Sequence, residues 1–161
     1  MFKLITAPIS SSSVKPPGLK VHQSGVPWDD ASGNRLRDWL QMSKEEFYGD
    51  KVALVPMGFR YPGRAKSGDL PPRKECADAW HKPLLAALPN VKLTVLIGGY
   101  AQARYLSEPQ PTLTETVKNF RSYLPNFLPL PHPSPRNNIW LKRNQWFEIE
   151  VLPTLRELIA R

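Results

Sequence analysis

Short apolar runs alternate along this chain with segments that have the spacing of amphipathic helices. The clearest runs are Val52–Val55, Val91–Ile97 and Phe127–Leu130, and Phe2–Thr6 is the candidate for a further strand. Strands that are separated by helices can pair in parallel, because each helix returns the chain to the starting edge of the sheet. The order therefore predicts an α/β fold, a three-layer αβα sandwich around a short parallel sheet of about four strands.

Capping patterns and apolar spacing predict the helices between these strands. The first expected helix is capped by Ser32 and has Leu36, Trp39 and Leu40 at helical spacing, and a capping box at Ser43-x-x-Glu46 starts the next. A longer helix is expected from Pro71-Pro72 to Leu88, with Cys76, Ala79 and Trp80 on one face and a kink or restart at Pro83. A short helix after Gly98-Gly99, a capping box at Thr112-x-x-Glu115 and a terminal helix bent at Pro153 complete the set.

Two parts of the chain differ in pattern. Residues 1–24 are poorly patterned: Ser10–Ser13 is a serine run, and Lys15-Pro16-Pro17-Gly18 interrupts any regular element. This part is a disordered tail, a long loop, or an altered or truncated first strand. Residues 25–161 are expected to form one domain.

Charge and cysteine content narrow the classes of protein. The 161 residues hold 22 Lys and Arg against 14 Asp and Glu, a net charge of +8, which makes a polyanion such as nucleic acid the first partner to consider and a merely basic surface the alternative. A single cysteine, Cys76, forms no intrachain disulfide, CxxC zinc site or four-cysteine cluster. No apolar stretch approaches the ~20 residues of a membrane span. We expect a soluble, cytoplasmic monomer without metal or cofactor.

The loop Pro131–Asn137 follows the last predicted strand. Its alternating prolines fix φ, so the side chains of His132 and Ser134 project from a stiff frame. A histidine at the end of a parallel strand is well placed to donate a hydrogen bond to a developing anion. Alternatively, a proline-rich segment of this kind is an ordinary turn or a polyproline II ligand for another domain.

A second segment, Gly25–Gly33, precedes the first predicted helix. Trp28 follows a proline and could serve as a stacking platform for a flat ligand. Asp29 and Asp30 either orient a water molecule or offset the positive end of the helix dipole, which is the commoner role for acids at such a position.

Several ordered blocks of the chain together resemble the uracil-DNA glycosylase superfamily, in particular a bacterial branch near the iron–sulfur-bearing glycosylases. The likeness runs from about Gly18 to the C-terminus. The blocks are Gly25-Val26-Pro27-Trp28, Ser32-Gly33, Arg35-Leu36, Pro56-Met57-Gly58-Phe59, Tyr61-Pro62-Gly63, Pro71-Pro72-Arg73-x-Glu75-Cys76, Leu113-Thr114-Glu115-Thr116, His132-Pro133-Ser134-Pro135 and Asn137-x-x-Trp140-Leu141-Lys142.

The resemblance implies a base-excision repair enzyme that hydrolyses the N-glycosidic bond of a deaminated base flipped out of DNA, with uracil favoured over hypoxanthine or xanthine. His132 would donate to the base, and Asp30, or else Asp29, would orient the water. The other implied roles are base binding by Trp28, Met57, Gly58, Ser134 and Asn137, insertion of Pro135 and Arg136 into DNA, and phosphate contacts by Arg60, Arg64, Lys66, Arg136, Lys142 and Arg143.

The chain departs from the family at three places. Lys15 stands where the family has a water-positioning Gln or Glu, and only Pro17 and Gly18 of that motif fit. The iron–sulfur-bearing relatives hold their cluster with four cysteines, and Cys76 alone cannot hold one. Many relatives recognise the uracil edge with an Asn after the second strand, where this chain has Pro56-Met57-Gly58. Backbone groups would then have to recognise the base.

These departures keep two alternatives open: a catalytically impaired DNA-binding relative, and an interaction protein that uses the prolines from Pro129 to Pro135. His22 and His81 are interpreted as structural residues.

Overall fold

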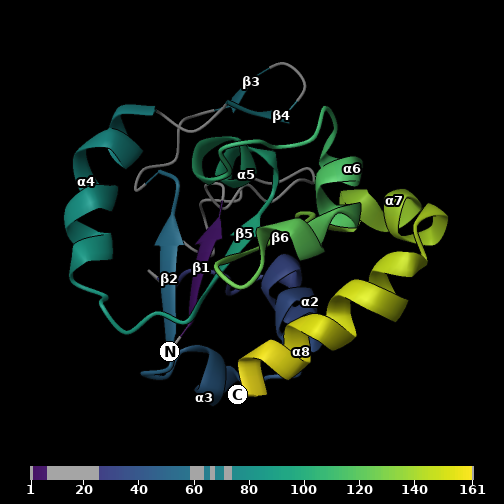
Figure 1. The fold of residues 1–161 in the computed structure, drawn as a ribbon, viewed down its shortest axis with the longest axis horizontal. Coiled ribbons are helices and arrows are strands. Elements are labelled where there is room, and N and C mark those ends of the chain that lie inside the picture. The colour runs from purple at the N-terminus through teal and green to yellow at the C-terminus, as the bar shows by residue number, and fades with distance from the viewer. Residues whose placement is uncertain (1, 7–25, 59–63, 66–67, 71–73, 161) are drawn as a thin grey trace.

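A computed structural model describes residues 2–6, 26–58, 64–65, 68–70 and 74–160 of the chain. At its centre is a parallel sheet with the strand order β2-β1-β5-β6 (Figure 1). The strands are β1 (Phe2–Thr6), β2 (Val52–Pro56), β5 (Leu93–Ile97) and β6 (Phe127–Leu130). Phe2 is paired with both Val52 and Leu93, so β1 lies between two strands that come much later in the chain. The predicted α/β class and parallel sheet are confirmed.

Helices follow each strand in the way that the alternation predicts. They are α2 (Ala31–Leu40), α3 (Lys44–Phe47), α4 (Lys74–Ala86), α5 (Gly99–Tyr105), α6 (Leu113–Lys118), the short 3₁₀ turns η1 (Phe120–Tyr123) and η2 (Pro135–Asn137), α7 (Asn138–Arg143), the π-helical turn η3 (Phe147–Val151) and α8 (Leu152–Ala160). A small antiparallel ribbon, β3 (Arg64–Ala65) and β4 (Gly68–Asp69), lies in the predicted loop after β2.

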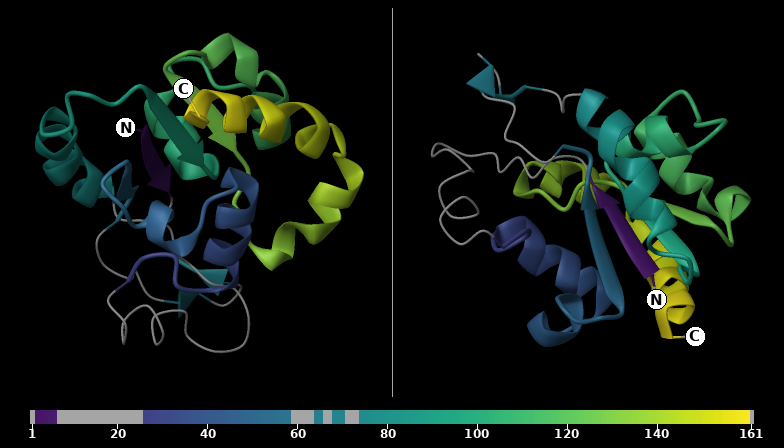
Figure 2. Two further views of the ribbon diagram at one scale, coloured as in Figure 1. Left: turned by 90° about the horizontal axis from the view of Figure 1, so that it is seen from below. Right: turned by 90° about the vertical axis from the view of Figure 1, so that its left-hand side faces the viewer.

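Two helix layers cover the sheet, one on each face (Figure 2, right). Along β5, Val95 and Ile97 point into a core shared with α2, α3 and α8, whereas Leu96 points into a second core shared with α4 and α5. All three side chains are fully buried. This alternation is the period of two that a strand buried on both faces requires.

The helix caps agree with the sequence pattern in two cases out of three. Both predicted capping boxes are formed, by Ser43 with Glu46 and by Thr112 with Glu115. The cap of α2, however, is Asp30 rather than Ser32, because Asp30 is extended and its carboxylate accepts from the Gly33 N–H at 2.9 Å. Ser32 lies inside the helix and is buried.

The buried face of α4 differs from the face that the sequence singled out. Ala77 and His81 are buried one turn apart, while Trp80 is 60% exposed. His81 is tolerated in the interior because its Nε2 bonds the carbonyl of Pro56 at 2.9 Å and its Nδ1 bonds the Tyr105 hydroxyl.

The two helical prolines are accommodated without ending their helices. Helix α4 continues through Pro83. The π-helical turn η3 ends two residues before Pro153, which lies in the first turn of α8. Proline has no N–H to donate, and a wider turn before it relieves the clash with the preceding carbonyls.

The carboxyl ends of the strands meet at one edge of the sheet. The end of β5 is joined to the end of β6 because the Gly98 N–H and the Gln102 side-chain amide both donate to the carbonyl of Leu130, each at 2.9 Å. Gly98 has a φ of 83°, which a glycine adopts without strain. In sheets of this kind the loops at this edge carry the ligand site.

Candidate functional site

The loop after β6 is held in one shape by hydrogen bonds of its own. The carbonyl of His132 accepts from the Asn137 side-chain amide at 2.7 Å, and the carbonyl of Ser134 accepts from the Asn137 N–H at 2.9 Å. The Ser134 hydroxyl caps η2 by accepting from the N–H of Arg136 at 3.2 Å. Ser134 and Asn137 were expected to bind the base. In the structure the Ser134 hydroxyl and the Asn137 side-chain amide form hydrogen bonds within the loop around His132.

The structure brings Trp28 and His132 together from distant parts of the chain. Their rings are stacked with centroids 5.5 Å apart and planes inclined by 30°. Trp28 is only 1% exposed. The two residues expected to contact the base are thus in contact with each other.

The imidazole of His132 has one ring nitrogen without a hydrogen-bond partner among the described residues. This nitrogen, Nε2, is buried. Burial lowers the pKa of His132 below its ordinary value, and the nearby Asp30 carboxylate opposes this only in part. The ring is therefore neutral at pH 7 and, among the described residues, its Nε2 has no protein hydrogen bond to lose when a ligand binds.

The backbone of Trp28 is in the left-handed region, with a φ of 64°. For a bulky residue this conformation costs roughly 1–3 kcal/mol and persists only where the surroundings impose it. Here the carbonyl of Trp28 lies against the first turn of α2: a Cβ on Gly33 would be 1.7 Å from that oxygen. Only glycine fits at position 33.

Arg35 and Arg37 are functional candidates that sequence reasoning missed. The Arg35 guanidinium donates to the carbonyl of Ser134 at 3.1 Å and so ties α2 to the His132 loop. The Arg37 guanidinium donates to the carbonyl of Trp28 at 3.3 Å. The sequence does show two arginines, two residues apart, just after Gly33. This pattern did not single them out, because it is also typical of an ordinary solvent-exposed helix.

The structure separates the two candidate carboxylates. Asp30 is close enough to His132 for its charge to act on the imidazole, although one of its oxygens caps α2. Asp29 forms an exposed ion pair with Lys44 at 3.2 Å. Of the two, Asp30 is the one beside the stacked rings.

The backbone of Met57 and Gly58 lies at the same edge, directly after β2. The Met57 side chain is 6% exposed and packs in the core between the sheet and α4, with Val55 and Ala77. This side chain points away from solvent, so at this position backbone groups are what a ligand could meet.

Three of the predicted phosphate contacts lie on one continuous segment beside the His132 loop. Arg136 in η2 and Lys142 and Arg143 in the last turn of α7 are all exposed, as is Pro135. Arg60 and Lys66 lie outside the described residues, and for Arg64 only the backbone is described. His22 and Lys15 also lie outside them.

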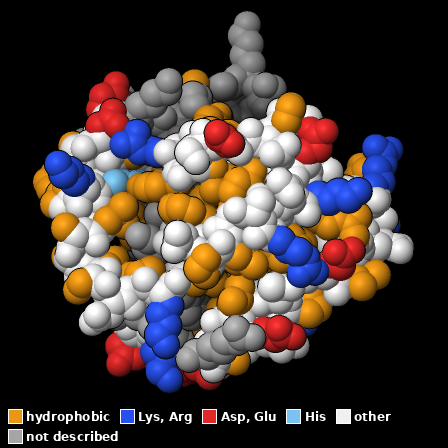
Figure 3. Space-filling view, in the orientation of Figure 1, with side chains coloured by type: hydrophobic (Ala, Val, Ile, Leu, Met, Phe, Trp, Pro, Cys, Tyr) orange, Lys and Arg blue, Asp and Glu red, His pale blue; other side chains and the backbone are white. Residues whose placement is uncertain are grey.

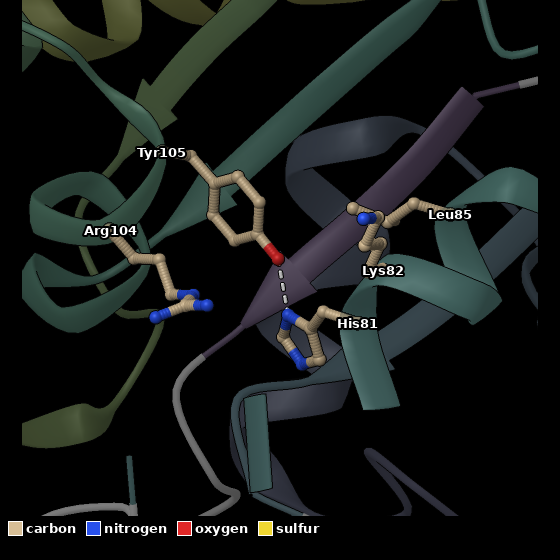
Figure 4. A pocket seen from close by; sticks show the side chains of 5 residues that line it. All are labelled: His81, Lys82, Leu85, Arg104 and Tyr105. Carbon is tan, nitrogen blue, oxygen red and sulfur yellow. Dashed lines mark hydrogen bonds between the residues drawn. The ribbon is translucent and has the colours of Figure 1, made fainter. Parts of the chain in front are cut away.

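A pocket of about 540 Å³ opens between α4 and α5, in the helix layer opposite to α2. Figure 4 shows its lining: the linked pair His81 and Tyr105, the cationic side chains of Lys82 and Arg104, and Leu85. Arg104 is paired with Asp78 at 2.7 Å. None of these side chains belongs to the predicted site, and His81 keeps the structural role expected of it, with partners that the sequence did not reveal.

No group of three or more His, Cys, Asp or Glu side chains in the described part of the chain is arranged to hold a metal ion. Among the same residues, no helix has the length and apolar character needed to cross a membrane.

The structure is an α/β protein with an open parallel sheet, and a half-buried histidine and a stacked aromatic residue lie in the loops at the carboxyl edge, where sheets of this kind bind ligands. The sequence model of the uracil DNA glycosylase superfamily matches residues 15–156, and the chain belongs to this family. Membership supports a DNA glycosylase role in base excision repair, with DNA as the partner.

Proposed function

We propose that this protein hydrolyses the N-glycosidic bond of uracil that has been flipped out of DNA. The observation that carries the proposal is the buried, unpartnered Nε2 of a neutral His132 against the ring of Trp28. A polar atom left without a partner in the interior costs free energy, and a carbonyl oxygen of a bound base would satisfy it.

Base binding requires an opening step. A glycosylase reaches the target sugar only after the nucleotide has left the stack, which costs a few kcal/mol and least at a mismatch. Because Trp28 is 1% exposed, the side chains that cover it must move before a base can stack on it. The flipped base would then lie on the indole, with the backbone of Met57 and Gly58 at the same edge available to its polar groups.

The chemical step is cleavage of the bond between C1′ and the base nitrogen. The bonding electrons remain with the base, and negative charge collects on its carbonyl oxygens. A neutral His132 would donate its Nε2–H to one of these oxygens. A single donor of this kind lowers the barrier by about 2.7–4 kcal/mol. Water adds its hydroxide to C1′, and its proton ends on the released base.

Asp30 is our candidate for orienting that water, with Asp29 second. One Asp30 oxygen caps α2, which leaves the other to accept from water. The same carboxylate lies at the start of α2, close enough to His132 for its charge to act on the imidazole.

An oligonucleotide panel tests the proposal. Uracil, hypoxanthine and xanthine are placed in single and double strands, and abasic product is read after alkaline cleavage. We expect uracil release by the wild-type protein, and a loss of tenfold or more in His132→Ala and in Trp28→Ala. Trp80→Ala is the matched control, because Trp80 is 60% exposed in the opposite helix layer. Wild-type rates in both site variants would refute the assigned roles.

The second candidate function is DNA binding without cleavage. It is favoured by the engagement of both acids, Asp30 as a helix cap and Asp29 with Lys44. It predicts salt-sensitive binding of duplex DNA by the wild-type protein and no abasic product from any member of the panel.

A further inference from the structure

Arg37 is a buried charge that the proposed chemistry does not use. It lies in the last turn of α2 and is 9% exposed. Lysine and arginine are almost never this buried unless their charge is paired or hydrogen-bonded. No carboxylate forms an ion pair with it among the described residues.

The guanidinium of Arg37 is instead placed by neutral groups. It donates to the carbonyl of Trp28 at 3.3 Å and to the side-chain oxygen of Asn34, and it lies over the ring of Phe47 at 5.6 Å. These contacts use the planar fork and the face of the guanidinium, which lysine cannot reproduce.

A second group acts on the same short stretch of backbone. The Tyr48 hydroxyl donates to the carbonyl of Pro27 at 2.6 Å. The charge of Arg37 also acts on Tyr48, where it opposes the rise in the hydroxyl pKa that burial causes. Two consecutive carbonyls, those of Pro27 and Trp28, are therefore each bound by a side chain from the α2–α3 segment.

The strained residue explains why such binding is needed. With a φ of 64°, Trp28 turns its carbonyl inward against the first turn of α2, where it would otherwise be a buried acceptor without a strong donor. In the ordinary extended conformation the indole would project in a different direction. The stack on His132 depends on this one backbone conformation.

We propose that Arg37 is a positioning residue, which holds the backbone of Trp28 in the left-handed conformation so that the indole faces His132. Its consequence for base excision rests on the function proposed above, whereas its consequence for the conformation of Trp28 does not.

The chain offers a matched control in an arginine of α8 that contacts α2. The Arg156 guanidinium donates to the carbonyl of Trp39 at 2.9 Å and also to that of Asp38. Like Arg37, Arg156 donates from its guanidinium to a main-chain carbonyl oxygen, but that oxygen belongs to α2 and not to Trp28. Arg156→Met therefore reports what the loss of such a contact does to stability alone.

Fluorine NMR of protein labelled with 5-fluorotryptophan reads the conformation of Trp28 directly. The chain has five tryptophans, and the Trp28 signal is the one missing from Trp28→Phe. We expect Arg37→Met to move or broaden that signal, Arg37→Lys to do so as well because it lacks the fork, and Arg156→Met to leave it in place. Tyr48→Phe, which removes only one hydroxyl, is expected to give a smaller change of the same kind.

Excision kinetics give the second readout. We expect Arg37→Met to lower the single-turnover rate of uracil release at least tenfold while the Kd for duplex DNA changes less than threefold, because phosphate contacts dominate that affinity. An unmoved Trp28 signal in folded Arg37→Met, or a rate loss no greater than that of Arg156→Met, would overturn the proposal. If Arg37→Met does not fold, Arg37→Lys and Tyr48→Phe decide by the same criteria. A wild-type protein that releases no uracil refutes the proposed function, and the fluorine signal still decides the role of Arg37.

Discussion

At the scale of single residues, His132 couples the proposed chemistry to protein stability. Its ring is largely buried and its pKa is lowered below the ordinary value of 6.5. The folded protein therefore holds a neutral imidazole at a pH where the unfolded chain binds a proton. Above the unfolded pKa both states are neutral, and the group contributes nothing to the pH dependence.

The first prediction follows from this difference. As the pH falls from about 8 to about 5, the wild-type protein should lose stability below the unfolded pKa of His132, and the loss should level off below the folded pKa. His132→Gln should lack this part of the loss. Chemical denaturation of both proteins across the range measures it, at about 1.4 kcal/mol per unit of pKa shift. Parallel curves for the two proteins would show that burial does not shift this histidine.

At the scale of elements, the first turn of α2 combines several tasks. Asp30 caps the helix, Gly33 admits the carbonyl of Trp28, and Arg35 donates to the loop after β6. The turn is thus where the Trp28 segment, the helix and the His132 loop are joined. A change in its backbone should affect stability and the stacked rings together.

Gly33→Ala makes this prediction specific. The added Cβ would lie 1.7 Å from the carbonyl oxygen of Trp28, so the backbone must move, and we expect a loss of about 2 kcal/mol or more in the free energy of unfolding. Gly99→Ala, in the first turn of α5, is the control, because its Cβ would meet only a Leu113 methyl at 3.9 Å. That variant should be neutral or gain about 0.4–1 kcal/mol. Equal effects in the two variants would contradict the steric reading of Gly33.

Much of the fold was predictable at this scale, because strands and helices here follow local apolar periodicity. β5 and both capping boxes are clear in the sequence. The buried face of α4 was not, because the residue that completes it, His81, is polar and its partners Pro56 and Tyr105 are brought to it only by the fold.

The residues of the candidate site stand out in the sequence, whereas their arrangement does not. His132 and Trp28 stand out because stiff prolines flank the histidine and a proline precedes the tryptophan. Their mutual stacking, the left-handed φ of Trp28 and the bond from Arg37 to its carbonyl depend on contacts across the chain, which periodicity does not encode. Asp30 caps α2 because its backbone is extended. Serine is an equally good cap by residue type, so the sequence alone does not decide between Asp30 and Ser32.

At the scale of the whole molecule, positive charge is scattered over the face of the molecule that Figure 3 shows. On the face shown in Figure 3, the Lys and Arg side chains lie in separate groups with Asp and Glu between them. The segment Pro135–Arg143 instead contains Arg136, Lys142 and Arg143 and no acidic residue, directly beside the His132 loop. If DNA is bound there, these three cations matter more than others of equal charge.

Salt titrations of DNA binding test this. The slope of log K against log salt is negative. Arg136→Ala and Lys142→Ala should each make it shallower by ~0.9, the value for one phosphate contact, and the double variant should make it shallower by about twice that. Lys82→Ala removes the same charge from the pocket between α4 and α5 and should leave the slope unchanged. Fluorescence anisotropy with a labelled duplex gives the slopes. A change as large in Lys82→Ala would mean that net charge, rather than this segment, governs binding.

The position of β1 in the sheet has a consequence for how the chain folds. Phe2–Thr6 pairs with Val52–Pro56 on one side and Leu93–Ile97 on the other, so both neighbours of the central strand emerge long after it during synthesis. Each ladder of β1 forms only after a long loop has closed, and non-local parallel pairing of this kind is slow. Until then the unpaired edges of the strand are open to pairing with another chain. Folding yield should therefore depend more on protein concentration than the small size of the domain suggests.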